Sequence, residues 1–176
     1  MIEKYNPTEY LIKLQKIKYR ALIFPIGVII ISFGVYYIFR INFMKYFSIA
    51  GLIVYFFIIM LFHVKKTIPP QTENNVVLAP IFGKISEIKD RKVKIKKSLF
   101  QPADIRCAES GKEINITSSR IYWFEKKAAL QGKLIGVIPA NAECICEIPD
   151  EFDIEVKIGQ KVEAGETIIG SKTRKI

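Results

Sequence analysis

Two long runs of residues without a charge, near the start of the chain, constrain its fold more than any other feature. The first run covers residues 21–39 and the second covers residues 46–62. A helix needs about 20 mostly apolar residues to cross a bilayer, so the first run is long enough and the second is at the short end. A cleaved signal peptide is a poor explanation, because the first run starts late and another apolar run follows at once. We therefore expect a hairpin of two membrane helices.

Basic residues around the two runs predict how this hairpin is oriented. Five Lys or Arg residues precede the first run, two more (Arg40 and Lys45) lie in the short connection, and many follow the second run. By the positive-inside rule, both ends of the hairpin and the rest of the chain are expected on the cytoplasmic side of the inner (cytoplasmic) membrane. A hairpin that dips into one leaflet only is an open alternative, because the second run is short.

The composition changes after the second run and predicts a separate domain. Residues 67–75 (TIPPQTENN) contain tandem prolines and polar side chains, which cannot continue a helix. Pro25, by contrast, is expected in the first turns of the first membrane helix, where proline is tolerated. The expected organisation is a polar cytoplasmic segment at 1–20, two membrane helices at 21–63, a linker at 64–75 and a β-rich domain at 76–176.

Short stretches of strand character follow the linker at intervals of roughly ten residues, which is typical of a small barrel or sandwich. Residues 92–96 (KVKIK) alternate strictly, which predicts one buried face. The expected strands are 76–78, 84–88, 93–95, 114–117, 120–124, 134–138, 144–148 and 152–157, with a helical turn at 125–130. We expect a hairpin turned at Ser118 and Ser119 and a closing hairpin at 158–171. The predicted fold is a two-helix membrane hairpin followed by an all-β, or β-rich α+β, domain with a barrel-sandwich-like core.

The charge distribution favours a membrane partner over nucleic acid. The net charge is +10, but aromatic residues do not alternate with the basic segment 84–97, and no glycine loop suited to phosphate is present. That segment is either a solvated outer face of strands or a surface that meets anionic lipid, where each Lys or Arg contributes about 1 kcal/mol. The acidic stretch 143–155 is expected to be a solvated rim rather than a metal or acid–base site. The expected partner is membrane phospholipid, and a homo-oligomer is compatible with the sequence.

The three cysteines do not predict a disulfide framework, because their number is odd and their spacing is irregular. Cys144 and Cys146 alternate as on a strand, so both thiols are expected on one face. No histidine or second cysteine pair completes a metal site around them. We expect buried, apolar thiols and no metal.

Three segments resemble phosphatidylserine decarboxylase in the short form found in archaea and many bacteria. Residues 76–85 (VVLAPIFGKI) resemble its "VVSPADGKV" strand, and residues 99–106 (LFQPADIR) resemble its "MSPFDVHVNR" segment. Residues 157–171 (KIGQKVEAGETIIGS) resemble its closing "KEGDRVEKGERIGxxxFGS". The segments occur in the same order as in that family, after a helical hairpin and an Ile-Pro linker. Together they predict a relation to enzymes of phosphatidylethanolamine synthesis.

The resemblance implies a covalent cofactor at the end of the last segment. In that family the serine of a Gly-Ser pair attacks the preceding peptide carbonyl, the chain splits, and the serine becomes a pyruvoyl electron sink. Ser171 would then be the pyruvoyl precursor and Gly170 its partner at the cleavage site. An Asp–His pair activates the serine in these enzymes.

The sequence departs from the family at that pair. Phe82 replaces the aspartate of "PADG" and Arg106 replaces the histidine of "DVH", while the one histidine of the chain, His63, lies at the membrane boundary. Arginine stays protonated and cannot act as a base. The sequence therefore predicts a divergent or inactive carboxy-lyase, without a cofactor if Ser171 is not processed, whose old cleft binds a lipid headgroup through Phe82, Arg106 and Lys112.

A second hypothesis is a non-catalytic lipid-binding or envelope adaptor protein with a lipoyl-like β domain. The hairpin at 159–166 is also similar to the hairpins of lipoyl and biotinyl carrier domains. Those carriers need a lysine in a tight turn, and the sequence offers no such context. The adaptor therefore stays open as an alternative, whereas a carrier role is not expected.

Overall fold

The chain divides into two compact units, Met1–Phe62 and His63–Ile176. The structure is a computed structural model that describes residues 7–65, 75–125 and 130–172. The expected helical turn at 125–130 falls mostly on residues outside these ranges. The predicted fold class is confirmed: two apolar helices are followed by a β-rich domain made of antiparallel sheets with a sandwich-like arrangement.

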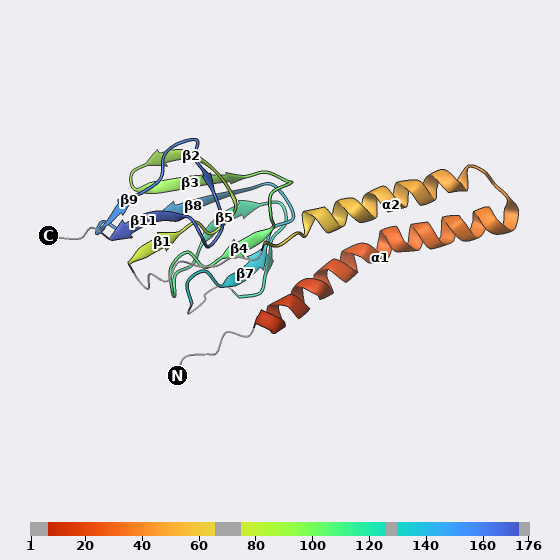
Figure 1. The fold of residues 1–176 in the computed structure, drawn as a ribbon, viewed down its shortest axis with the longest axis horizontal. Coiled ribbons are helices and arrows are strands. Elements are labelled where there is room, and N and C mark those ends of the chain that lie inside the picture. Colours follow the sequence, from red (N-terminus) through yellow and green to blue (C-terminus); the bar gives the residue numbers. More distant parts are fainter. Residues whose placement is uncertain (1–6, 66–74, 126–129, 173–176) are drawn as a thin grey trace. The chain divides into compact units, whose positions relative to one another are not determined.

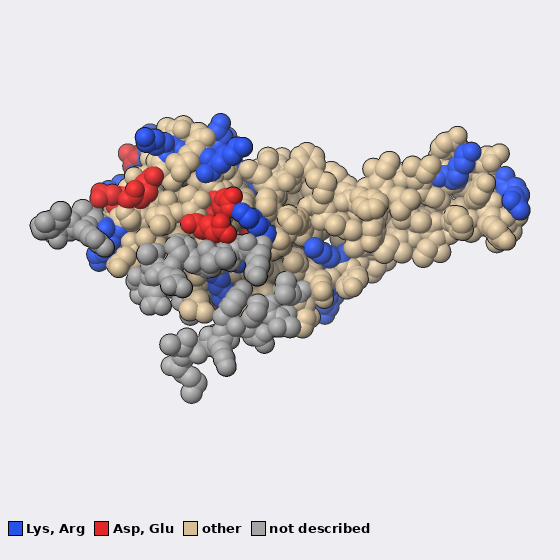
Figure 2. Space-filling view, viewed as in Figure 1, with Lys and Arg blue, Asp and Glu red and all other residues tan. Residues whose placement is uncertain are grey.

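The first unit is an antiparallel pair of helices, α1 (Pro7–Phe39) and α2 (Met44–Leu61) (Figure 1). Both are long and apolar enough to cross a membrane, over Ile12–Phe39 and Met44–Leu61. Most of their large apolar side chains are exposed, and the surface of this unit carries few charges (Figure 2). A helix that is apolar all round is stable in lipid or in a protein core, so these two helices are consistent with association with a membrane.

The two helices approach closely at Gly51 of α2. A Cβ added there would lie 2.7 Å from Ile29 Cγ1 and 3.4 Å from the Pro25 carbonyl oxygen. The prediction that Pro25 lies in the first turns of a helix is wrong, because α1 begins at Pro7 and Pro25 lies in its interior. Residues 7–20 belong to the same helix, so the start of the apolar run does not mark a helix end.

The second unit contains three antiparallel sheets (Figure 1). The largest has the order β10-β2-β3-β8-β5, the second has the order β1-β11-β9, and the third has the order β4-β7-β6. The strands are β1 (Val76–Leu78), β2 (Gly83–Lys89), β3 (Lys92–Lys97), β4 (Asp104–Arg106), β5 (Asn115–Ser118), β6 (Tyr122–Trp123), β7 (Leu134–Val137), β8 (Ala142–Glu147), β9 (Phe152–Ile154), β10 (Lys161–Val162) and β11 (Ile168–Lys172).

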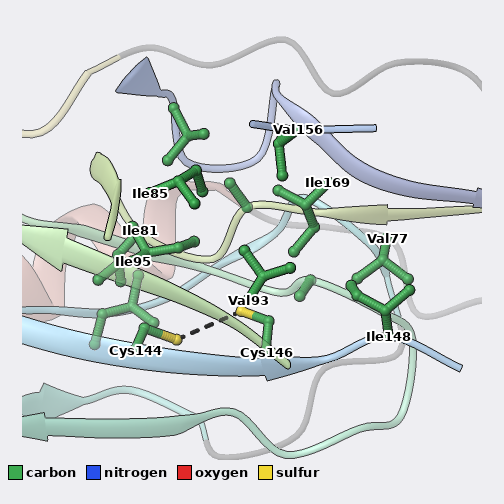
Figure 3. Packing of buried hydrophobic residues seen from close by; sticks show 14 of the residues in the cluster. Val77, Ile81, Ile85, Val93, Ile95, Cys144, Cys146, Ile148, Val156 and Ile169 are labelled. Atoms are coloured by element: carbon green, nitrogen blue, oxygen red, sulfur yellow. Dashed lines mark hydrogen bonds between the residues drawn. The ribbon is translucent and has the colours of Figure 1, made fainter. Parts of the chain in front are cut away.

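Alternation along β3 and β8 builds the core of this unit. Val93 and Ile95 of β3 are fully buried, as the alternating pattern predicts. They lie opposite Cys146 and Cys144 of β8, and Figure 3 shows these side chains within one apolar cluster. The two thiols are buried on one face, with their sulfur atoms 3.7 Å apart.

The sequence predicts hairpins at 114–124 and 158–171, and both predictions are wrong, because the two strands of each segment do not pair with each other. β5 pairs with β8 and β6 pairs with β7, so the residues on either side of Ser118 and Ser119 enter different sheets. β10 pairs with β2, whereas β11 pairs with β1 and β9. Alternation and turn residues are local signals, and they do not decide which distant strand completes a sheet.

Arg91 joins the β2–β3 turn to the β8–β9 connection. Asp90 and Arg91 have positive φ angles of 47° and 59°, which is the geometry of a tight type I′ hairpin turn. The Arg91 side chain donates to the carbonyl oxygens of Ile148 (3.2 Å), Pro149 (2.5 Å) and Phe152. One guanidinium therefore binds two carbonyl groups of the β8–β9 connection and the carbonyl group of Phe152 at the start of β9.

We predict that Arg91→Ala lowers the free energy of unfolding by about 2 kcal/mol, because hydrogen bonds from a charged donor are stronger than neutral ones. Urea unfolding of the full chain in detergent, followed by the fluorescence of Trp123, measures this. Lys92→Ala is the matched control: its exposed ion pair with Glu147 (3.0 Å) is worth at most about 1 kcal/mol. Equal losses in the two variants would contradict the role given to Arg91.

Candidate functional site

Residues 63–65, the entry segment of the second unit, are hydrogen-bonded to Ala103 and to the first and last residues of β4. The Ala103 backbone N–H donates to the His63 carbonyl oxygen (2.7 Å). The Lys65 N–H donates to Asp104 Oδ1 (3.1 Å), and Arg106 Nη2 donates to the Lys65 carbonyl oxygen (2.9 Å). The side chains of Asp104 and Arg106 thus bind both backbone polar groups of Lys65.

Asp104 and Arg106 form a buried ion pair at the centre of this site. Asp104 is fully buried and Arg106 is 6% exposed. Arg106 Nη2 and Nε lie 2.7 and 3.2 Å from Asp104 Oδ2, and Nη1 donates to the Gly132 carbonyl oxygen (3.4 Å). Burial raises the pKa of Asp104, and the charge of Arg106 opposes that rise. The guanidinium is therefore fully engaged in interactions within the fold.

Gly165 permits the guanidinium stem to lie against the backbone of the β10–β11 connection. Its φ angle is +73°, and a Cβ added there would lie 3.2 Å from Arg106 Cγ. A positive φ strains residues with a side chain, and the close approach adds a steric reason for glycine at this position. The last of the three family-like segments thus packs on the second one.

Phe82 also contacts Lys65. Its ring is buried, and Lys65 Nζ lies 6.0 Å from the ring centroid, the outer limit of a cation–π contact. The ammonium group also pairs with Glu163 and lies 3.9 Å from Glu166 Oε2. Lys65 therefore contacts two of the predicted site residues, Phe82 through its side chain and Arg106 through its carbonyl oxygen.

Gly170 and Ser171 lie in a different environment, in the central strand of the β1-β11-β9 sheet. Gly170 is opposite Val77 on one side and Ile154 on the other, and Ser171 is opposite Val76 and Asp153. A Cβ added at Gly170 would lie 3.0 Å from Ile148 Cγ2. The Ser171 hydroxyl donates to Glu155 Oε1, whereas the hydrogen bonds described for Arg106 go to Asp104, Gly132 and Lys65.

Lys112, the last predicted site residue, faces a surface cavity of about 370 Å³. Its Nζ pairs with Glu109 Oε1 at 2.8 Å. Glu113 and Glu147 also line the cavity, whose apolar wall includes Val77 and Cys146. The cavity therefore carries more negative than positive charge, which does not favour an anionic ligand next to Lys112.

Sequence reasoning missed Lys65 and Lys97. Lys97 is 3% exposed, and its Nζ donates to the carbonyl oxygens of Ser98 and Ala140, both at 3.3 Å. Burial lowers the pKa of Lys97 to about 8, although the charge of Asp104 opposes this. The sequence did contain a signal for the burial of Lys97, because position 97 follows Val93 and Ile95 on the buried face of β3. For Lys65 the sequence holds no comparable signal.

The basic segment at 84–97 meets acidic residues across the sheet. Lys94 and Lys96 pair with Glu143 at 2.7 and 3.1 Å, and Lys92 pairs with Glu147. These contacts raise the pKa of Lys94 and lower the pKa of Glu143, chiefly through their hydrogen bond. Opposite charges also lie close together on the visible face of the second unit (Figure 2). The paired charges favour a solvated outer face for this segment.

The described residues contain no group of three or more His, Cys, Asp or Glu side chains placed to hold a metal ion. The sulfur atoms of Cys144 and Cys146 lie 3.7 Å apart. This hydrogen bond and the burial of Cys144 raise its pKa well above the ordinary value. A buried thiol with a raised pKa is not a reactive thiolate. The cysteines are therefore part of the core.

One comparison with known proteins gives a match. Over 99 residues the chain is 35% identical to a protein of Methanococcoides burtonii named "Putative archaetidylserine decarboxylase proenzyme", and the match covers 53% of this chain. The chain spans 43% of the length of that relative. No protein-family model and no solved structure matches the chain. The likeness agrees with the family-like motifs and relates the chain to phospholipid metabolism.

The last family-like segment differs from its pattern in spacing. In "KEGDRVEKGERIGxxxFGS", more residues separate the Gly-Glu pair from the Gly-Ser pair than separate Gly165 from Gly170 here. When the two are aligned from Gly165, Ser171 falls before the position of the family's serine. The correspondence between Ser171 and that serine therefore depends on a deletion within β11 or just before it.

We predict that Arg106→Ala destabilises the second unit by about 3 to 5 kcal/mol, because it leaves the buried Asp104 carboxylate without its cation. Urea unfolding of the full chain in detergent measures the loss. The double variant Asp104→Leu/Arg106→Met removes both charges and is expected to lose less. If Arg106→Ala is as stable as the unaltered protein, the ion pair is not the structural element that its burial indicates.

We also predict a pH dependence from Lys97. Its pKa is about 8 in the folded chain and near its ordinary 10.5 in the unfolded chain, so between these pH values the folded state binds fewer protons. The free energy of unfolding then rises with pH across this window and is level below it. Lys97→Met abolishes the rise, whereas Lys96→Met, an exposed neighbour, keeps it. Identical pH profiles for the unaltered protein and Lys97→Met would refute this.

Proposed function

We propose that this protein is a membrane-attached relative of the phospholipid decarboxylases that binds phospholipid and does not cleave itself. The observation that best supports this is the position of Lys65, which contacts both Phe82 and Arg106. These residues stand where the resembled family has its aspartate and histidine. Here they bind the chain's own entry segment, and neither an aromatic ring nor a permanent cation can remove a proton from a serine.

A pyruvoyl group made from Ser171 does not fit its surroundings. Its formation requires a base at the hydroxyl and attack on the carbonyl of Gly170. Both residues lie in a central strand that is paired on its two sides. The hydroxyl donates to Glu155, whose carboxylate is exposed to solvent. We expect no covalent cofactor in this chain.

The attachment to lipid that we propose comes from the two apolar helices, as predicted from their length and composition. Under this proposal the organisation is a polar segment at 1–20, membrane helices at 21–63, a linker at 64–75 and a β domain at 76–176. The positive-inside rule places the β domain on the cytoplasmic side. Membrane phospholipid is the partner, and a homo-oligomer is compatible with this arrangement.

We predict that the purified full chain has the mass of one uncleaved polypeptide of 20.2 kDa. Ser171→Ala is expected to differ only by the lost oxygen atom, because no processing depends on the hydroxyl. Intact-mass spectrometry after expression in membranes measures both proteins. A shortened chain with a pyruvoyl end, present in the unaltered protein and absent from Ser171→Ala, would overturn the proposal.

The contact between Ser171 and Glu155 is the one observation that favours an active decarboxylase as a second candidate. A carboxylate that accepts the serine hydroxyl proton could replace the missing histidine, although at a much lower rate. Glu155→Gln keeps the size of the side chain and removes its basicity. Under this second candidate, Glu155→Gln would stop any self-cleavage while the fold remains intact.

A further inference from the structure

The β3–β4 connection contains a turn with a defined shape and an exposed aromatic tip. The Ser98 backbone N–H donates to Gln101 Oε1 (2.8 Å), and the Gln101 N–H donates to the Ser98 carbonyl oxygen (3.2 Å). The buried Lys97 ammonium group also donates to the Ser98 carbonyl oxygen. Phe100, at the tip, is 66% exposed. The turn therefore holds a large apolar side chain outward without drawing it into the core.

This turn lies close to the residue at which the chain enters the second unit. Ala103 follows Phe100 by three positions, and its N–H binds the His63 carbonyl oxygen. Three residues span at most about 11 Å. His63 comes directly after α2 and its C-terminal cap, Phe62. Phe100 is thus three residues from Ala103, which is hydrogen-bonded to the first residue after the C-cap of α2.

We propose that Phe100 inserts into the headgroup region of the bilayer and holds the β domain against the membrane. Trp and Tyr concentrate at this depth of a bilayer, and Phe and Leu are among the residues that interfacial helices bury there. A rigid turn that is already ordered loses little conformational freedom when it inserts. This inference rests on the proposed membrane attachment, and it adds a second contact with lipid that belongs to the β domain itself.

The chain contains a matched control in the turn between β9 and β10. There the Lys157 N–H donates to Gln160 Oε1 (3.0 Å), and the Gln160 N–H donates to the Lys157 carbonyl oxygen (3.1 Å). Ile158 is 65% exposed at its tip. The Gln160 carbonyl oxygen accepts from Ile85 in β2, so this turn is bonded to the large sheet rather than to His63. It has the same pair of hydrogen bonds and a similarly exposed apolar side chain without the neighbouring entry segment, although Ile158 is the second residue of its turn and Phe100 is the third.

The test places one tryptophan at each tip in a Trp123→Phe background. The full chain is reconstituted into vesicles whose lipids carry bromine just below the headgroups. We predict that Phe100→Trp has blue-shifted emission and roughly threefold stronger quenching by these lipids than Ile158→Trp, because interfacial aromatics sit at that depth. Equal quenching of the two tryptophans overturns the inference, and so does protection of Phe100→Trp from aqueous acrylamide without quenching by bromine, which indicates a protein partner.

Flotation of the same vesicles separates this inference from the proposed membrane attachment. A protein that does not float with lipid disproves the attachment itself, whereas one that floats with equal quenching at both tips disproves only the insertion of the turn. If Trp123→Phe fails to fold, Phe100→Cys and Ile158→Cys with an environment-sensitive dye give the same comparison. The native cysteines are buried and are not expected to react with the dye.

Discussion

The ion pair between Asp104 and Arg106 is the interaction on which the organisation of the second unit depends. Two charges removed from water are stable only if other groups satisfy their remaining hydrogen-bonding capacity. Here that capacity is met by the backbone of Lys65 and by Gly132. The pair is therefore fully hydrogen-bonded only when the entry segment is in place. The β domain and the attachment of residues 63–65 therefore require each other.

This requirement gives the two departures from the family pattern a common physical explanation. An aspartate and a histidine at positions 82 and 106 would be suited to proton transfer, whereas an aromatic ring and a guanidinium are suited to binding a lysine and a backbone carbonyl group. Phe82 and Arg106 both do so with Lys65. Under the proposed function, these two residues bind the entry segment and do not transfer a proton.

The sequence predicts the elements of this protein better than their pairing. Alternation locates β3 and β8 and the burial of Cys144 and Cys146, because each residue's face depends only on its own strand. The turn residues at Ser118 predict a hairpin, but the two flanking strands enter different sheets. In the candidate site, Phe82 and Arg106 were found through resemblance. Lys65 was not, since its place depends on a contact with Asp104, which lies 39 positions away.

The entry segment is connected through hydrogen bonds to the interior of the β domain. His63 is bonded to Ala103, and Ala103 in turn accepts from Ile138 next to β7 (2.7 Å). The turn that presents Phe100 begins at Ser98, whose carbonyl oxygen is bonded by buried Lys97. The segment from 97 to 106 is therefore anchored on both sides of its exposed tip, by a buried amine before it and a buried ion pair after it. These anchors hold the backbone on both sides of Phe100, so the fold itself presents this side chain at the surface of the β domain.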